Sequence, residues 1–324
     1  MRRSCASPWR SKLNGEGGQV TDKTAYPLSG VVPIIHTPWT EDDRIDFPSL
    51  ERLIERSIED GISGCIMPAV ASEVTKLSDE ERTSFVEEVI RLVDGRVHVT
   101  AGVSDPDVKR SQRLARHAVE AGADGVLCQA PMDIIEDKQQ VKAFMHELAE
   151  VDLPMLMVQD LHWNGYGMGL DTIRELWEEI DSFRCLKLET VPAGYKMTQI
   201  IEATDGMMPV GTGWSLPQLI EALDRGTSFV TTTAINKPFV HILHQYRAGN
   251  RDEADRLFKG TLPYLAWAHQ HIDISIHFYK LYSHRRGLFT TSRARQPILP
   301  FDKYHVRVAN EIIDEMIEFE DGLG

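Results

Sequence analysis

The chain has 324 residues, of which 42% are hydrophobic and 26% are charged, and these proportions are ordinary for a globular protein. A chain of this size can bury a core that needs neither disulfides nor a structural metal. The net charge of −14 and the lack of a long basic block argue against a nucleic-acid partner. No apolar run is long enough to span a bilayer, so no membrane partner is expected.

The cysteines indicate a reducing compartment. Cys5, Cys65, Cys128 and Cys185 form no CxxC pair, and three of them lie in apolar, strand-like runs. This pattern favours buried free thiols over a disulfide or zinc framework, and it predicts a cytoplasmic protein. Residues 1–27 are basic and lack apolar periodicity. We expect a disordered tail or an upstream start there rather than a targeting segment, because there is no secretory apolar region and no clear amphipathic helix.

From residue 30 onward, short β-rich runs alternate with amphipathic stretches, which is typical of βα units. The predicted strands are 30–38, 63–69, 97–103, 125–130, 154–160, 183–189, 207–212 and 228–233. The predicted helices are 48–60, 78–93, 107–121, 137–150, 170–180, 192–203, 215–224 and 237–247.

Eight strands, each followed by a helix, predict a (β/α)8 TIM barrel over residues 28–248. Helical patterns at 251–284 and 303–320 predict a C-terminal helical extension over residues 249–324. An open, doubly wound sheet is the competing fold. It is disfavoured because the turn after the first strand reads HTPWTEDD and holds no glycine for a phosphate loop.

A lysine stands inside the sixth predicted strand, in the sequence Cys185-Leu186-Lys187-Leu188-Glu189. Alternate residues of a strand share a face. Since helices cover the outside of a barrel, the leucines should face outward and Lys187 and Glu189 inward. Burying a lysine costs free energy unless it is paired or used, and removal from water favours the uncharged amine, a nucleophile toward carbonyls. On this stretch alone, a structural ion pair and a catalytic lysine are equally favoured.

In a barrel of this kind, the site lies at the carboxyl ends of the strands. Short motifs follow one another there in a fixed order. They are V-x-x-x-x-TP (Val32 to Pro38), a loop ending in Glu73 followed by L-S-x-E-E, DGR-x-x-V-x-AG (Asp94 to Gly102), AGADG (Ala121 to Gly125), Pro131, DLP (Asp152 to Pro154), the lysine strand and a glycine after strand seven.

The order and spacing of these motifs, over about residues 28 to 290, resemble the dihydrodipicolinate synthase / N-acetylneuraminate lyase family of class I aldolases. The resemblance implies that Lys187 matches the strand-six lysine, which condenses with a 2-oxo acid, usually pyruvate, to form an imine. It also implies a homotetramer or dimer.

Two stretches depart from the family pattern. The family's G-T-T/S-G-E reads Ala69-Val70-Ala71-Ser72-Glu73 here, so the usual hydroxyl pair is missing, although backbone N–H groups of Val70 and Ala71 can still hold a carboxylate. The tyrosines that follow the fourth-strand proline are replaced by Met132-Asp133.

Strand five departs as well. The proton-shuttling tyrosine of the family falls at Val158, and the arginine for a second carboxylate falls near Trp163. These losses argue against a true dihydrodipicolinate synthase.

Imine formation needs a general acid/base to release water from the carbinolamine. Glu189 is the first candidate because it shares the inward face with Lys187. Asp160 is the second, with loop capping as its alternative role. The predicted substrate-binding residues are Thr37, His36, Val70, Ala71, Ser72, Gly211, Thr231, Thr233 and Trp163.

Several of these side chains have open alternatives. His36 either donates to substrate or is a core histidine bonded to the backbone. Trp163, Trp214 and Tyr166 predict an aromatic wall that suits a substrate with an apolar portion. The segment His269 to His271, with His277, is interpreted as helix surface or subunit contact, because helical neighbours two apart do not share a face. No metal and no cofactor are expected.

The leading function is a lyase or aldolase that joins Lys187 to a small 2-oxo acid and makes or cleaves a C–C bond. The same imine would serve a dehydratase or hydratase-aldolase. A catalytically impaired, ligand-binding family member is a second class. A metal-dependent barrel lyase that uses Glu189, Asp160 and His36 is a third.

Overall fold

The computed structural model describes residue 26 and residues 28–323. The predictions for the tail of residues 1–27, apart from Tyr26, lie outside the described residues.

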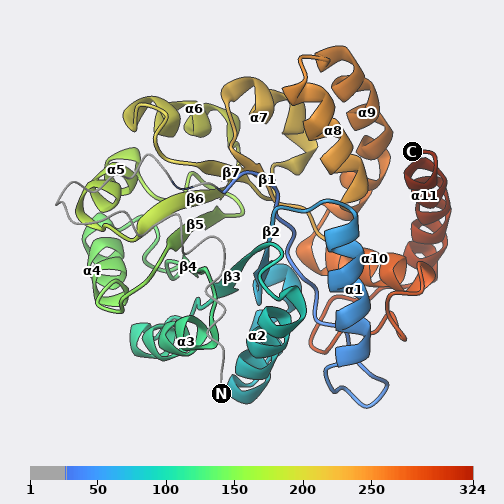
Figure 1. Cartoon of the computed structure of the whole chain (residues 1–324), viewed down its shortest axis with the longest axis horizontal. Coiled ribbons are helices and arrows are strands. Elements are labelled where there is room, and N and C mark those ends of the chain that lie inside the picture. The colour runs from blue at the N-terminus through green and yellow to red at the C-terminus, as the bar shows by residue number, and fades with distance from the viewer. Residues whose placement is uncertain (1–25, 27, 324) are drawn as a thin grey trace.

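Eight parallel strands form the centre of the molecule in the order β1-β8-β7-β6-β5-β4-β3-β2 (Figure 1). A parallel bridge between Ile34 and Ile66 joins the chain after β1 to β2 and completes the ring. The predicted TIM barrel is therefore confirmed. The strands are β1 Gly30–Val31, β2 Gly64–Met67, β3 His98–Gly102, β4 Gly125–Gln129, β5 Leu156–His162, β6 Phe183–Thr190, β7 Val210–Thr212 and β8 Phe229–Val230.

The first strand is much shorter than the predicted 30–38. Beyond Val31 the chain still follows the barrel, with the N–H of Val32 on Val230 and the N–H of Ile34 on Thr232. Pro33 lies between them and has no N–H to donate, so the regular ladder is interrupted there.

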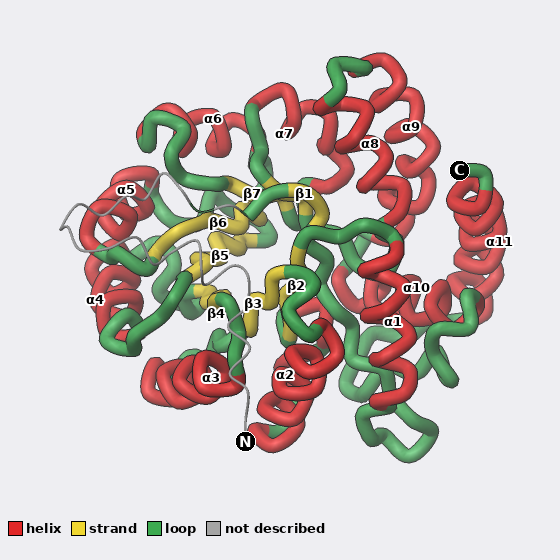
Figure 2. Tube along the Cα trace, viewed as in Figure 1, coloured by secondary structure: helices red, strands yellow, loops and turns green. Residues whose placement is uncertain are grey.

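Helices surround the strands on the outside, as Figure 2 shows in red around the central yellow strands. They are α1 Phe47–Glu59, α2 Asp79–Val93, α3 Val108–Ala121, α4 Lys138–Leu148, α5 Leu170–Glu179, α6 Gly194–Ala203, α7 Leu219–Arg225 and α8 Lys237–Arg247. The extension adds α9 Arg251–Ala268, α10 Ile272–Arg285 and α11 Lys303–Asp321.

The apolar residues form two separate cores, and these fix the direction of each strand residue. Leu186 and Leu188 belong to the large core between strands and helices, whereas Cys185 belongs to the small core inside the barrel. Lys187 and Glu189 therefore point into the barrel, as the alternation predicted.

The side chains of β5 that face the barrel interior are shifted by one residue from the prediction. Val158 lies in the outer core and Met157 in the inner one, so Gln159 faces inward and Asp160 outward. The alternation along β5 is regular, since Met155 and Met157 lie in the inner core and Leu156 and Val158 in the outer one. The register irregularity in the β5–β6 ladder lies on β6, where the pairing passes from Phe183 to Cys185. The inward neighbour of Lys187 on β5 is consequently Gln159 rather than the residue at 158.

A buried ion pair joins the extension to the loop after β2. Lys280 of α10 donates to Glu73, and both side chains are 0% exposed. Glu73 also accepts from Trp39 Nε1 at 2.9 Å and Lys76 Nζ at 3.2 Å. Burial acts to raise the pKa of Glu73, but the charge and hydrogen bond of Lys280 outweigh it and hold the pKa below its usual value. Burial lowers the pKa of Lys280 to about 8.

Breaking this pair should destabilise the whole chain. Lys280→Met leaves a buried carboxylate with only its weaker donors, and the expected loss in the free energy of unfolding is about 3–5 kcal/mol. The measurement is a urea unfolding curve. Lys259→Met is the matched control, because the Lys259 side chain is 68% exposed and should change stability by only about 0.5 kcal/mol. Equal midpoints for the two variants would contradict the prediction.

Candidate functional site

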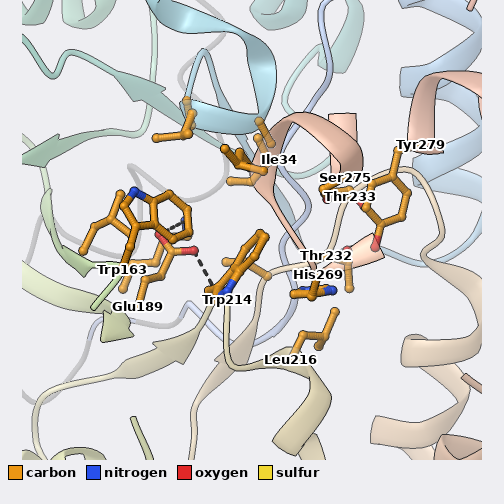
Figure 3. Close-up of a pocket in the computed structure, with 18 residues that line it drawn as sticks. Ile34, Trp163, Glu189, Trp214, Leu216, Thr232, Thr233, His269, Ser275 and Tyr279 are labelled. Atoms are coloured by element: carbon orange, nitrogen blue, oxygen red, sulfur yellow. Dashed lines mark hydrogen bonds and ion pairs between the residues drawn. The ribbon is translucent and has the colours of Figure 1, made fainter. Parts of the chain in front are cut away.

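A cavity lies at the carboxyl ends of the strands, where barrel enzymes place their sites. Its walls come from nearly every part of the barrel and from the C-terminal extension. The lining residues are Ile34, Ala69–Ala71, Leu161, Trp163, Lys187, Glu189, Gly213, Trp214, Leu216, Thr231–Thr233, His269, Ile272, Ser275 and Tyr279. Figure 3 shows Trp163 and Glu189 on one side of this cavity and Tyr279 on the other, with Trp214 and His269 between them.

The lysine and its carboxylate are in contact inside the cavity. Lys187 Nζ donates to Glu189 Oε2 at 2.6 Å, and the two side chains are only 4% and 10% exposed. The amide of Gln159 donates to the same oxygen, and the backbone N–H of Trp214 donates to Oε1 at 3.0 Å. Figure 3 draws this last bond as a dashed line. The carboxylate is thus fixed from three directions, with one oxygen held against the amine.

A glycine makes room for this carboxylate. A Cβ atom added at Gly213 would lie 2.1 Å from Glu189 Oε1, so Gly213→Ala must push Glu189 aside. A displacement of a catalytic group by about 1 Å can cost about 100-fold in turnover. Cγ and Cδ of Glu189 would also lie within 2.4 Å of the new Cβ, so the side chain must move from Cγ outward. The three nearest atoms are all side-chain atoms, so the fold should be retained.

Gly194→Ala is the control for this variant. Its Cβ would lie 2.4 Å from Oε1 of Glu221, which is an exposed side chain outside the cavity. Steady-state turnover should therefore fall only for Gly213→Ala. Equal rates for the two alanine variants would show that the position of Glu189 does not matter.

The loop after β2 presents backbone donors to the cavity. Val70 and Ala71 open a 3-10 helix, and the first N–H groups of a helix have no partner within it. Ser72 Oγ donates to Ile35 O at 2.6 Å and accepts from Ala69 N at 3.0 Å. Thr37 Oγ1 donates to Ser72 O at 2.6 Å. Thr37 and Ser72 thus shape the loop from outside the cavity, whereas Val70 and Ala71 line it.

Strand β8 and the tryptophans form other walls. Thr231 donates to the carbonyl of Thr212, and Thr233 is hydrogen-bonded to the hydroxyl of Tyr279. Trp163 packs edge-on against Trp214, with 5.0 Å between ring centroids. Both tryptophans line the cavity as predicted for an aromatic wall.

The third aromatic residue expected in this wall, Tyr166, lies elsewhere. It is 42% exposed and bonds Gln199.

Three other predicted site residues, Asp160, Gly211 and His36, lie outside the cavity. Asp160 points toward the helices and pairs with Lys196, and both side chains are 0% exposed. Burial raises the pKa of Asp160, and Lys196 only partly offsets this effect. The loop-capping alternative describes its contacts better, since it accepts from Met168 N at 2.9 Å. Gly211 is packed against the ring of Phe229, deeper in the barrel.

His36 fits neither of its two expected roles. It is 1% exposed, packs 5.7 Å from the ring of Tyr279, and does not line the cavity. Among the residues that the structure describes, neither of its ring nitrogens has a hydrogen-bond partner. Burial lowers its pKa to about 3, so the ring is neutral near pH 7.

The extension supplies cavity residues that the sequence did not reveal. His269, interpreted above as surface, follows α9 and lines the cavity together with Ser275 and Tyr279 of α10. His269 Nδ1 bonds Leu265 O at 2.9 Å, and burial lowers its pKa to about 4. The neutral ring must therefore carry its proton on Nδ1, which leaves Nε2 as an acceptor. The only local sign that His269 does not lie on a continuous helix surface is the break between α9 and α10 at residues 269–271.

Over residue 26 and residues 28–323, no group of three or more His, Cys, Asp or Glu side chains has the geometry to hold a metal ion. Within the same part of the chain, none of the helices has the length and apolarity needed to cross a membrane.

The closed barrel, the cavity at its carboxyl end and the buried lysine–carboxylate pair define a (β/α)8-barrel protein with a lysine at its candidate site. The Dihydrodipicolinate synthetase family model matches residues 27–316, so the chain belongs to this family. Members of the family are lyases.

The individual relatives are distant. An uncharacterized DapA-like lyase of Rhizobium meliloti is 29% identical over 68% of this chain and 72% of its own length. A 4-hydroxy-tetrahydrodipicolinate synthase of Methanococcus maripaludis is 25% identical over 73% of this chain and 81% of its own.

Solved structures share the fold. The 4-hydroxy-tetrahydrodipicolinate synthase of Methylacidiphilum fumariolicum has a TM-score of 0.81 at 22% identity, covering 91% of this chain and 98% of its own. Dihydrodipicolinate synthase of Rhodopseudomonas palustris has a TM-score of 0.81 at 24% identity, covering 89% and 98%.

Proposed function

We propose that this protein is a class I lyase or aldolase that forms an imine between Lys187 and a pyruvate-like 2-oxo acid and makes or cleaves a C–C bond. The observation that carries the proposal is the 2.6 Å contact between the Lys187 amine and Glu189 inside the cavity. This contact gives the amine a proton acceptor, and the family supplies the precedent for the lysine at this position.

The first step is imine formation. The substrate carboxylate binds the free N–H groups of Val70 and Ala71, which places the 2-oxo carbon beside Lys187. Glu189 takes a proton from the ammonium, and the neutral amine attacks C2. Glu189 returns this proton to the oxygen of the adduct, which gives the carbinolamine. It then carries a second proton from the nitrogen to the hydroxyl, which leaves as water, and the positively charged imine remains.

The second step uses the imine as an electron sink. In cleavage, Glu189 removes the proton of the C4 hydroxyl, the C3–C4 bond breaks, and its electron pair forms an enamine while an aldehyde leaves. Protonation at C3 and addition of water then release the oxo acid and restore Lys187. Synthesis is the same sequence in reverse. If a C3 proton of the uncleaved imine is removed instead, the resulting enamine keeps C4. It can then expel the protonated C4 hydroxyl as water, which is the reaction of a dehydratase or hydratase-aldolase.

We also propose that the reaction is not dihydrodipicolinate synthesis. Gln159 faces inward beside Lys187, where a proton relay would need a tyrosine, and it holds Glu189 instead. The tyrosine that lines the cavity, Tyr279, comes from α10 and bonds Thr233. A catalytically impaired ligand-binding protein is the alternative, and turnover separates it from an enzyme.

The location and assembly stay predictions. We propose a cytoplasmic homo-oligomer, dimer or tetramer, as the family resemblance implies. One solved structure with a TM-score of 0.80 to this chain is described as a monomeric dihydrodipicolinate synthase variant. Sedimentation of the full chain would decide between these states.

Borohydride trapping tests the proposal. The protein is incubated with pyruvate and a panel of other 2-oxo acids, reduced, and measured by intact mass and peptide mapping. We expect one adduct per chain, located on the peptide that holds Lys187. Unmodified protein across the whole panel would overturn imine chemistry. An adduct without any product from 4-hydroxy-2-oxo acids would favour the ligand-binding alternative.

A further inference from the structure

A second cavity of about 500 Å³ adjoins the lysine cavity. Ala69, Val70, Leu161 and Trp163 line both, so the two spaces share a wall. The second cavity lies at the ends of β2 to β5, on the side of the lysine cavity away from α10. None of the steps above uses it.

The walls of this cavity are mostly apolar. Leu77, Leu127, Pro131 and Met132 line it in addition to the shared residues. A cavity of about 150 Å³ already accommodates benzene when its walls are apolar. The space therefore suits a group at least as large as an aromatic ring.

The charged groups in the same walls are engaged with the protein. Arg110 pairs with Asp105 at 2.6 Å and with Asp79. Arg82 is 5% exposed and donates to Val74 O at 3.1 Å and to Ser104 O at 3.4 Å. These bonds hold the two guanidinium groups against the loops after β2 and β3. Uncharged polar residues, Thr75, Ser104 and Gln129, also line the cavity, but apolar surface makes up the larger part of its walls.

The position of Gln159 indicates where the carbon chain of the substrate extends from Lys187. Its side chain lines the second cavity and also donates to Glu189, the partner of Lys187. Val70, whose N–H is assigned to the substrate carboxylate, lines both cavities. With C1 at Val70 and C2 at Lys187, the carbon chain beyond C3 runs past Gln159 into the second cavity.

We infer that the second cavity binds an apolar, ring-sized group at C4 of the substrate. The substrate class is then 4-hydroxy-2-oxo acids, or their dehydrated 3,4-unsaturated counterparts, that carry an aryl or bulky alkyl group. This inference rests on the proposed function, since it takes the imine at Lys187 as the fixed end of the substrate.

The test compares three probes in the borohydride assay: pyruvate, 2-oxo-4-phenylbutanoate and 2-oxoglutarate. The phenyl compound has no C4 hydroxyl, so it can be trapped without cleavage. We expect it to half-saturate trapping at a concentration about 10-fold or more below that of pyruvate, the order expected for burying a phenyl ring. 2-Oxoglutarate should show no such gain.

A charge placed in the second cavity should remove the preference. Met132 is 44% exposed and lines only this cavity of the two, so Met132→Glu should fold and should lower the phenyl-to-pyruvate preference about 10-fold. Met207→Glu is the matched control, because Met207 is 38% exposed and lines neither cavity. It should keep the wild-type preference.

The outcomes separate the inference from the function on which it rests. Trapping of pyruvate with equal or weaker trapping of the phenyl compound would overturn the inference and leave the imine intact. Preference for 2-oxoglutarate would also overturn it, and would show that the arginines in these walls bind the second carboxylate. Absence of any adduct would remove the proposed function itself.

Discussion

Replacing Lys187 by methionine is expected to abolish both the trapped adduct and turnover. Methionine keeps an unbranched side chain in the barrel but has no amine to attack C2, so no imine forms. Loss of a covalent nucleophile costs on the order of 10⁶-fold in turnover in other enzymes. Product formation should therefore fall by about that factor, and the intact mass after reduction should equal that of unmodified protein.

The fold should tolerate this change. Glu189 keeps the amide of Gln159 and the backbone N–H of Trp214 as donors, so the variant does not leave a carboxylate buried without partners. Lys259→Met is again the control. It removes an exposed lysine on α9 and should retain the full adduct. An adduct that persists in Lys187→Met but disappears in another lysine variant would show that the imine forms elsewhere.

The lysine and its carboxylate could be predicted because strand alternation is a local property. One apolar–polar repeat from Cys185 to Glu189 fixed which side chains point inward, whatever the rest of the chain does. The pattern could not choose between a structural ion pair and a catalytic one. The structure shows why both descriptions fit, since Lys187 and Glu189 are paired and both line the cavity.

The phase of β5 could not be predicted in the same way. Period two holds along β5, but residues 155–158 are all apolar, so the pattern does not show which alternate set faces the barrel interior. The family resemblance placed position 158 inward, and with it Asp160. The structure places Met157 inward instead, so Gln159 enters the site and Asp160 leaves it.

The contribution of the C-terminal extension to the cavity could not be predicted from the sequence either. A helix shows which of its faces is apolar, but it does not show which surface it will cover. His269 lines the cavity because α10 packs across the mouth of the barrel, where Lys280 pairs with Glu73. That contact joins residues 207 positions apart, and a single sequence carries no sign of it.

Glu189→Gln should separate proton transfer from nucleophilic attack. Glutamine has the same shape, and its carbonyl oxygen can still accept from the N–H of Trp214, so the cavity should keep its walls. Its NH2 group replaces the oxygen that accepts from Lys187 and Gln159. Gln159 can turn its amide oxygen toward this NH2 group, whereas Lys187 loses its acceptor. The amide cannot carry a proton between the amine and the carbinolamine oxygen. Loss of a general acid/base costs about 10²- to 10⁴-fold. We therefore expect turnover to fall by that factor, while prolonged incubation with pyruvate still gives the borohydride adduct on Lys187.

Glu189→Asp distinguishes this role from a purely structural one. Aspartate keeps a carboxylate one methylene further from the amine. If Glu189 transfers the proton, Glu189→Asp should recover part of the turnover that Glu189→Gln loses. If Glu189 only holds the cavity in shape, Glu189→Gln, which has the same shape, should be the more active of the two variants. Wild-type turnover in Glu189→Gln would exclude Glu189 as the proton carrier. His269, which also lines the cavity and whose Nδ1 bonds Leu265 O, would then be the next residue to replace.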